Sequence, residues 1–298
     1  MEKLIVILGP TASGKSEFAI ELAEKFNGQI VSADSRQIYQ ELNIGTAKIK
    51  EEDKKNITHY LLDFIKPNQD FSLAEYKKAA LKAISQVHQE NQLPFLVGGT
   101  GLYIQAIVDN LAIPQAKPDP RLRQEIEKEI EKEGLKSVYE KLLRIDPGAK
   151  DFIDPKNPRR IIRALEVCYT TGQPFSAQRK KQAPLFESLQ IGLDIDFEKL
   201  EEKIDNRVEA MIKEGLIEET KKILQKYKAS VPALQTIGYQ ETLDYLQGKI
   251  NLKDAKELIK LHTRQYAKRQ LTWLKKDKRI KWVRSRSEAK KIIKSFLD

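Results

Sequence analysis

The first third of the chain alternates short apolar runs with longer segments whose apolar residues recur at helical spacing. The apolar runs occupy residues 4–8, 29–32 and 94–97. The segments 17–23 and 72–91 have the spacing of amphipathic helices, and Ser72 with Glu75 forms the capping-box pattern of a helix start. Strands separated by helices predict a parallel sheet with right-handed crossovers, whose ligands gather at the carboxyl ends of the strands.

The pattern changes after residue 112. Residues 113–120 contain three prolines, as is typical of a hinge or linker. From Arg121 to about Arg179 the spacing is entirely helical, and an apolar strand pattern returns at 189–195. Two long helical segments and a short strand follow, at 197–228, 252–275 and 280–283. An all-helical block between two strand-bearing segments predicts an insertion in the sheet domain.

The loop after the first apolar run has the sequence GPTASGKS, a complete G-x-x-x-x-G-K-[ST] phosphate loop between a predicted strand and a predicted helix. Backbone N–H groups of such a loop form a nest for a diphosphate, and the helix N-terminus adds partial positive charge. We expect Lys15 to reach the terminal phosphates and Ser16 to hold Mg²⁺. The predicted diphosphate-binding residues are Gly9, Pro10, Thr11, Ala12, Ser13, Gly14, Lys15 and Ser16.

These patterns together predict an α/β fold. We expect a parallel sheet like that of P-loop NTPases, flanked by helices and interrupted by an all-helical insertion domain. The predicted divisions are residues 1–115 for the first part of the core, 116–187 for the insertion and 188–298 for the second part of the core with basic C-terminal helices.

Two further strand ends carry candidate chemistry. P-loop proteins that hydrolyse nucleotides usually place an aspartate after another strand to hold Mg²⁺, but here the third strand leads into the Gly-rich turn 98–101. Asp34, which ends the second strand, either serves the metal, accepts a proton from an attacking N–H or O–H, or caps the following turn. Thr100 either donates its hydroxyl to a ligand oxygen or is the N-cap of the next helix.

The net charge of +10 is concentrated near the C-terminus. Residues 251–298 hold 16 lysines and arginines against 5 acidic residues, a net charge of +11. This block indicates a polyanionic partner, usually nucleic acid, although a solvated helix face has a similar composition. Arg264 and Lys268 lie one helical turn apart, with Tyr266 and Trp273 interleaved. Basic and aromatic residues on one helix suit RNA, unless the rings pack in the core.

A second basic group opens a predicted helix in the insertion. Arg159, Arg160 and Arg163 follow Asn157 and Pro158. Positive charges at a helix start oppose the macrodipole and therefore favour an anionic ligand, unless carboxylates pair with them.

Other features limit the class of protein. No apolar run approaches the roughly 20 residues of a membrane span. The first apolar run leads directly into the phosphate loop, which is not the pattern of a signal peptide. The single cysteine, Cys168, excludes an intramolecular disulfide and a Cys-rich zinc site. We therefore expect a cytoplasmic protein without membrane contact.

Six motifs in order resemble the tRNA dimethylallyltransferase family, also called tRNA isopentenyltransferases. They are GPTASGKS, SADSRQIY with NIGTAK, GGTGLY, NPRRIIRALEV with TGQPFS, IGYQE and TRQYAKRQLTW. The resemblance covers nearly the whole chain. Eukaryotic members tend to add a Cys/His zinc finger near the C-terminus, which this chain does not show, so it resembles the bacterial type.

The resemblance implies transfer of a dimethylallyl group from dimethylallyl diphosphate to N6 of the adenine 3′-adjacent to the anticodon in tRNA, with Mg²⁺ as cofactor. Asp34 would be the general base, Thr100 would donate to the bridging oxygen, and Arg207 would neutralise the leaving diphosphate. The adenine would leave its stack to reach the site. Positions that resemble tRNA-binding residues are Asp34, Ser35, Arg36, Gln37, Thr100, Arg123, Arg159, Arg160 and Arg163.

Three alternatives stay open at this point. A small-molecule P-loop kinase predicts ATP turnover and needs no basic C-terminal block. An adenylate isopentenyltransferase would act on a free nucleotide, which the helical insertion and the +11 charge of 251–298 disfavour. A nucleotide-dependent RNA-binding protein without chemistry predicts tRNA binding and no product. For an enzyme that surrounds the anticodon stem-loop of tRNA, a monomer is the simplest expectation.

Overall fold

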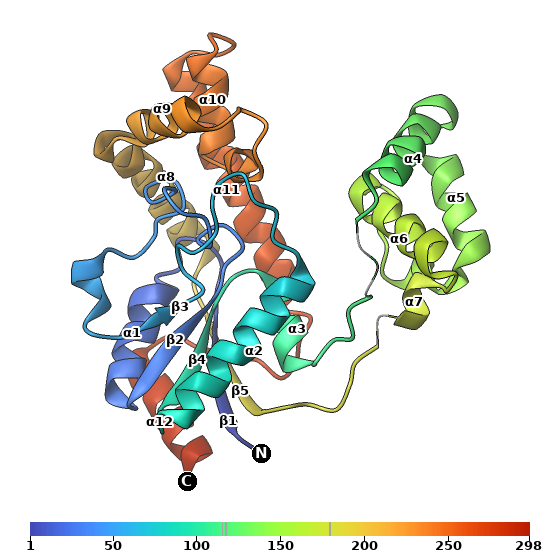
Figure 1. Cartoon of the computed structure of the whole chain (residues 1–298). Helices are drawn as coiled ribbons and strands as arrows, with labels where there is room; N and C mark the ends of the chain where they lie inside the picture. The colour runs from blue at the N-terminus through green and yellow to red at the C-terminus, as the bar shows by residue number, and fades with distance from the viewer. Residues whose placement is uncertain (115, 117, 179) are drawn as a thin grey trace. The chain divides into compact units, whose positions relative to one another are not determined.

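The computed structural model describes all residues except 115, 117 and 179, and it divides into two compact units. The first comprises 1–108 and 184–298, and the second comprises 109–183 (Figure 1). The predicted linker at 113–120 and the predicted end of the helical block at Arg179 therefore lie partly outside the described residues.

Six parallel strands form the sheet of the first unit, in the order β3-β2-β4-β1-β5-β6. The strands are β1 (Lys3–Leu8), β2 (Gly28–Ala33), β3 (His59–Tyr60), β4 (Leu93–Gly98), β5 (Glu187–Leu193) and β6 (Lys281–Val283). The predicted α/β fold with a parallel sheet is confirmed. β3 is the strand that the sequence did not predict, because two residues are too short for a hydrophobic period to be recognised.

Helices cover both faces of the sheet. They are α1 (Lys15–Lys25), α2 (Leu73–Gln89), α3 (Gly101–Val108) and α12 (Arg286–Leu297). Alternate residues of β1 serve the two sides: Leu4 and Val6 pack with α2 and α3, whereas Ile5 and Ile7 pack with α1 and α12. Both faces of the central strand are therefore buried, as parallel sheets require. The N–H of Glu75 donates to Ser72 Oγ at 3.2 Å, so α2 begins with the predicted capping box.

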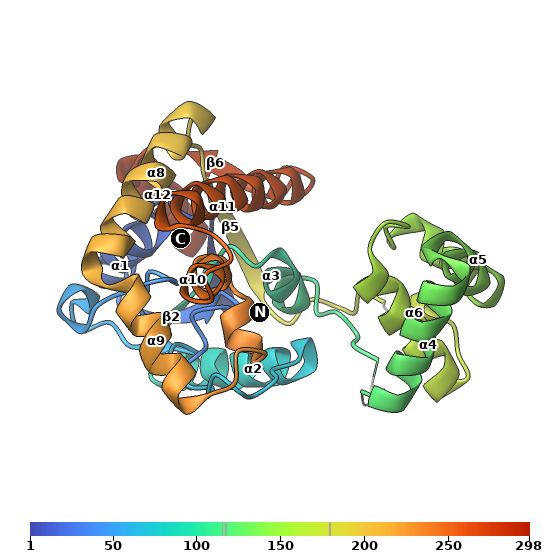
Figure 2. The ribbon, with the colours of Figure 1, turned by 90° about the horizontal axis from the view of Figure 1, so that it is seen from above.

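A layer of helices lies beyond the carboxyl ends of the strands (Figure 1). It contains α8 (Phe197–Glu214), α9 (Leu216–Lys226), α10 (Tyr239–Leu246) and α11 (Leu252–Leu274). The predicted helical segment 197–228 is two helices, because Gly215 has φ of 104° and ends α8 before α9 begins. α8 and α11 pack side by side, as Figures 1 and 2 both show. Ile38, Val208 and Tyr239 belong to the apolar core of this layer.

The second unit is helical and has its own apolar core, which includes Ile126, Leu142 and Leu165. Its helices are α4 (Pro120–Glu133), α5 (Leu135–Ile145), α6 (Pro158–Thr171) and α7 (Phe175–Gln178). The two chain segments that enter and leave the unit bond to each other: the N–H of Ala112 donates to Lys180 O at 2.8 Å. This pairing explains why the unit spans 109–183, while the sequence divides the chain at 116 and 187.

Candidate functional site

Three loops meet at the carboxyl edge of the sheet. β1 and β2 both pair with β4, so that Leu8 and Ala33 each lie opposite Gly98. The N–H of Thr100 donates to Ala33 O at 3.1 Å. A Cβ at position 98 would collide with the backbone of Ala33, which explains the glycine. This pairing brings the phosphate loop, Asp34 and Thr100 to one edge.

The phosphate loop is a tight turn between β1 and α1. The N–H of Ser13 donates to Pro10 O at 3.3 Å, and Ala12 and Gly14 have φ of 62° and 83°. α1 begins at Lys15, so a helix N-terminus adjoins the loop. This is the arrangement in which backbone N–H groups and the helix dipole favour an anion.

Two cations from distant parts of the chain lie at this loop. Lys15 Nζ donates to Pro10 O at 3.3 Å, and Arg207 on α8 donates from Nη1 to Thr11 Oγ1 at 3.4 Å. Burial lowers the pKa of Lys15 to about 8, with the charge of Asp34 opposing this effect and that of Arg207 adding to it. Burial also lowers the pKa of Arg207, again opposed by Asp34. One carboxylate thus faces two desolvated cations, which leaves positive potential for an anionic ligand.

The half-buried Asp34 carboxylate stabilises a turn and also faces a cavity. Its Oδ1 accepts from the N–H groups of Arg36 at 2.8 Å and Gln37 at 3.3 Å, so the carboxylate caps the turn after β2. The same side chain also lines the cavity described below. The capping interpretation and the proton-accepting interpretation are therefore compatible, because a carboxylate has two oxygens.

Thr100 is joined to the Asp34 turn through its neighbour Ser35. Thr100 Oγ1 accepts from the Ser35 N–H at 3.0 Å and donates to Ser35 Oγ at 3.3 Å. Tyr266 on α11 lies nearby, and burial raises its pKa to about 12, with the negative charge of Asp34 adding to the shift. The phenol is therefore a neutral donor at ordinary pH.

A cavity of about 460 Å³ opens between these loops and the helical layer of the same unit. Its polar wall holds Thr11, Asp34, Ser35, Arg36, Thr100 and Arg207. Its apolar wall holds Ile204, Val208, Met211 and Ile259 from α8 and α11. A smaller cavity of about 20 Å³ touches Lys15, Ser16 and Asp34. Paired polar and apolar walls suit a ligand with a charged head and a short hydrocarbon tail.

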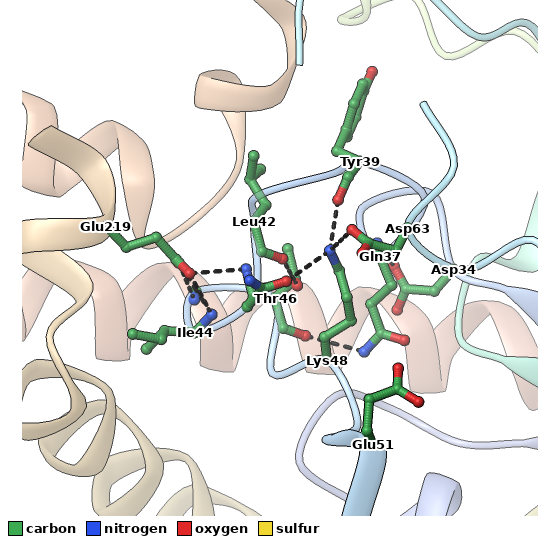
Figure 3. Close-up of polar contacts among 12 residues, drawn as sticks. Asp34, Gln37, Tyr39, Leu42, Ile44, Thr46, Lys48, Glu51, Asp63 and Glu219 are labelled. Atoms are coloured by element: carbon green, nitrogen blue, oxygen red, sulfur yellow. Dashed lines mark hydrogen bonds and ion pairs between the residues drawn. The ribbon is translucent and has the colours of Figure 1, made fainter. Parts of the chain in front are cut away.

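The loop after Asp34 is fixed by hydrogen bonds to its own backbone (Figure 3). Gln37 Nε2 donates to Thr46 O at 3.0 Å and to Ala47 O at 3.2 Å. Lys48 Nζ donates to Tyr39 O at 2.6 Å. The side-chain amide of Gln37, predicted to touch RNA, therefore positions the loop in this structure.

Glu219 on α9 holds the far end of the same loop (Figure 3). Its carboxylate accepts from the consecutive N–H groups of Asn43, Ile44 and Gly45 at 3.0 to 3.3 Å. The buried Tyr239 donates its hydroxyl to Glu219 and accepts from the Gly45 N–H at 3.1 Å. Because Gly45 and Thr46 line the cavity, Glu219 sets the position of that wall.

In the helical unit, the predicted tRNA-binding arginines divide into two kinds. Arg123 Nε lies 2.8 Å from Oε1 of Glu166, and Arg163 Nη1 lies 2.5 Å from its Oε2. Burial alone would raise the pKa of Glu166, but hydrogen bonds from both arginines and from the Asp119 N–H hold it below its usual value. By contrast, Arg159 and Arg160 are exposed in the first turn of α6.

The basic and aromatic residues of α11 also have different surroundings. Arg264 pairs with Asp205 of α8, whereas Lys268 is exposed. Tyr266 lines the cavity, and Trp273 packs over Gly101 in the core, where a Cβ at position 101 would collide with its ring. α11 therefore contributes both to the core and to the cavity.

Sequence reasoning missed Glu219, Tyr239 and Gln270 as site residues. Gln270 accepts from the N–H of Thr11 at 2.8 Å and donates to Gly99 O at 2.9 Å. Tyr239 and Gln270 stand in motifs that the sequence analysis quoted, IGYQE and TRQYAKRQLTW. Glu219 had no signal, because one glutamate on an amphipathic helix looks like any solvent-facing residue.

A family model and individual known proteins that resemble this chain all have prenyltransferase names. A family model described as IPP transferase matches residues 37–277. A protein of Gloeothece citriformis named tRNA dimethylallyltransferase is 46% identical over 281 residues, which are 94% of this chain and 90% of that protein. A protein of the same name from Acetivibrio thermocellus is 42% identical over 95% of this chain and 92% of its own length.

Two solved structures of related enzymes have a similar fold over most or all of this chain. The tRNA isopentenylpyrophosphate transferase of Bacillus halodurans has a TM-score of 0.74 and 37% identity, covering 100% of this chain and 96% of that one. A eukaryotic dimethylallyltransferase solved while acting on tRNA has a TM-score of 0.77 and 29% identity, over 92% of this chain and 70% of that one.

Proposed function

The chain belongs to the IPP transferase family, and we propose that it transfers a dimethylallyl group from dimethylallyl diphosphate to N6 of the adenine 3′-adjacent to the anticodon in tRNA, releasing diphosphate. The observation that carries this proposal is the cavity whose polar wall holds Asp34, Thr100 and Arg207 and whose apolar wall can cover a five-carbon chain. In the reaction the allylic C–O bond of the donor breaks and a C–N6 bond forms.

Each residue has one task in this proposal. The N–H groups of the phosphate loop, with Lys15 and Arg207, hold the diphosphate and stabilise the negative charge that it gains on leaving. The carboxylate of Asp34 accepts the proton from the adenine N6 amine. The hydroxyl of Thr100, which donates to Ser35 Oγ in the structure, would turn to donate to the bridging oxygen between the allyl carbon and the diphosphate.

The residues present also fit a magnesium ion. Ser16 lines the small cavity beside Lys15 and can offer its hydroxyl oxygen there, and oxygen donors together with substrate phosphates are the ligands that Mg²⁺ prefers. Among the described residues no group of three or more His, Cys, Asp or Glu side chains gathers at a metal-sized site, so the diphosphate itself would complete the coordination. When bound, the metal would neutralise part of the diphosphate charge.

For RNA binding we propose the helical insertion and the basic C-terminal block. Arg159 and Arg160 are exposed on the insertion, and residues 251–298 carry a net charge of +11. Arg123 and Arg163 instead order the insertion through Glu166. We expect tRNA affinity to fall steeply with salt, because each phosphate contact releases counterions.

No helix in the described part of the chain is long and apolar enough to cross a membrane. With tRNA as substrate we further propose a cytoplasmic enzyme, and we propose a monomer because the enzyme has to surround a large RNA stem-loop.

The direct test supplies tRNA and Mg²⁺ with dimethylallyl diphosphate labelled in the allyl group, and in parallel with ATP labelled at the γ-phosphate. We expect the allyl label, and no phosphate label, to move to tRNA. Transfer of the phosphate label would instead identify a kinase. Binding of tRNA with no transfer of either label would identify a binding protein without chemistry.

A further inference from the structure

Gln270 is a buried polar residue whose two bonds join separate parts of the site. It stands near the end of α11 and is 7% exposed. Its Oε1 accepts from the Thr11 N–H at 2.8 Å, and its Nε2 donates to Gly99 O at 2.9 Å. One side-chain amide thus bridges the phosphate loop and the turn after β4.

The bridge connects the phosphate loop to the turn that carries Thr100. The transfer reaction requires a constant distance between these two elements. Thr11 belongs to the loop that holds the diphosphate, and Gly99 precedes Thr100, which faces the reacting centre. A Cβ at position 99 would collide with the amide of Gln270, so the glycine permits the close approach. α11 also carries Tyr266 and Arg269, which line the cavity, so the bridge links three elements of the site.

The chemistry of the bridge requires a neutral group with one donor and one acceptor. A carboxylate at this position would accept from Thr11 but repel Gly99 O. An apolar side chain of the same length would leave a half-buried N–H and a buried C=O without their partner. Glutamine meets both demands and adds no charge beside the diphosphate.

We propose that Gln270 is a positioning residue for the transfer reaction, which fixes the phosphate loop relative to Thr100. The proposal rests on the proposed function, since it concerns the same site. Gln270 does not line the cavity of about 460 Å³, so its role is through its bonds to Thr11 and Gly99.

The test compares three variants. Gln270→Glu changes the amide to a carboxyl, Gln270→Met removes both bonds at similar size, and Gln265→Glu makes the same charge change at an exposed position of the same helix. Transfer is measured at saturating tRNA and donor between pH 5.5 and 8.5, as the rate relative to wild type at each pH. Thermal unfolding and tRNA affinity are measured for every variant.

We expect kcat of Gln270→Met to fall about 10- to 100-fold at every pH, because misplacement of reacting groups by about 1 Å has effects of this size, with tRNA affinity within about twofold of wild type. For Gln270→Glu we expect a similar loss at pH 8.5 and a recovery toward pH 5.5. A protonated carboxyl has one O–H donor and one acceptor oxygen, so it rebuilds both bonds, and burial favours the protonated form. Gln265→Glu should match wild type throughout.

Wild-type kcat in Gln270→Met would overturn the proposal, and so would a Gln270→Glu loss that does not depend on pH. A loss of tRNA affinity as large as the loss of kcat would also overturn it, because it would show general damage to α11. If wild type transfers no allyl group, the proposed function fails, which is a different outcome from any of these.

Discussion

In the helical unit Arg123 and Arg163 both contact the carboxylate of Glu166, whereas in the core unit Lys15 and Arg207 lie at the phosphate loop with neutral oxygens as their bonded partners. Among the described residues, neither of these core cations makes an ion pair. The carboxylate that opposes them, Asp34, acts on both from a distance and uses Oδ1 to cap a turn.

The two sets of cations differ in whether a ligand can use their positive charge. An arginine paired with a buried carboxylate stabilises its own unit, and leaving that carboxylate unpaired would be strongly destabilising. A desolvated cation without a counter-ion instead lowers the stability of the fold, as the lowered pKa of Lys15 indicates. A bound diphosphate would pair with these cations and remove the destabilisation. The free energy recovered in this way would strengthen diphosphate binding.

The largest expected effect concerns the opposing carboxylate. Asp34→Asn keeps an oxygen that can cap the turn but removes the proton acceptor. We expect the transfer rate to fall about 10²- to 10⁴-fold, with tRNA affinity within a few-fold of wild type. The same change at Asp196, which caps α8 outside the cavity, is the matched control and should leave the rate unchanged. Near-normal transfer by Asp34→Asn would remove its assignment as the base.

A pair of substitutions tests the contrast between the two units. Arg207→Met should lower transfer about 100-fold or more, because charge on the leaving diphosphate is no longer stabilised, while the melting temperature stays equal or rises. Arg123→Met should lower the stability of the helical unit by about 1–3 kcal/mol, since it removes a hydrogen-bond partner from the buried Glu166 carboxylate, and should keep kcat at saturating tRNA. The contrast fails if the two variants show the same pattern.

The pKa of Lys15, lowered to about 8 by burial, predicts a pH dependence of donor binding. Diphosphate prefers the protonated amine, so affinity is full below the pKa and is lost as pH rises through it. Between pH 7 and 9 the dissociation constant of the donor should rise about tenfold. In Lys15→Met, calorimetry should give a weak and flat profile. A slope that survives this substitution would assign the titration to another group.

The smallest expected effect concerns Glu219, a carboxylate satisfied by backbone N–H groups. Glu219→Gln should loosen the wall formed by Gly45 and Thr46 and raise KM for tRNA about threefold, which is about 0.7 kcal/mol, without changing donor affinity. Glu218→Gln, on the exposed side of the same helix, is the matched control. Equal effects of both variants would mean that α9 charge, rather than the loop, is responsible.

Local patterns allowed part of this molecule to be predicted. The phosphate loop and the capping box at Ser72 each depend on residues close in sequence, so a short motif was enough to predict each of them. The alternation of strand and helix patterns was likewise enough to predict a parallel sheet. The pairing of Arg123 with Glu166 could not be predicted, because a charged helix carries the same pattern whether its arginines face solvent or a carboxylate 43 residues away.

The site shows the same limit at longer range. Gln270 contacts Gly99 across 171 residues, and Arg207 contacts Thr11 across 196. Hydrophobic periodicity along the sequence does not indicate contacts between residues so far apart. Only the family resemblance indicates Arg207. Gln270 lies in a motif whose basic and aromatic residues suggest RNA binding, and that interpretation assigns no role to a glutamine.

The two segments that bound the helical unit pair with each other, and this pairing suggests a way to engineer the chain. Asn110 Nδ2 donates to Ala183 O at 2.9 Å, and Lys181 Nζ lies 2.8 Å from the Asp109 carboxylate, so the unit leaves and rejoins the core through one narrow stem. Closing a loop across such a short gap has a small entropic cost. A short Gly-Ser bridge from Val108 to Pro184 should therefore replace the unit and leave a folded core, and a different helical module could be joined at the same stem.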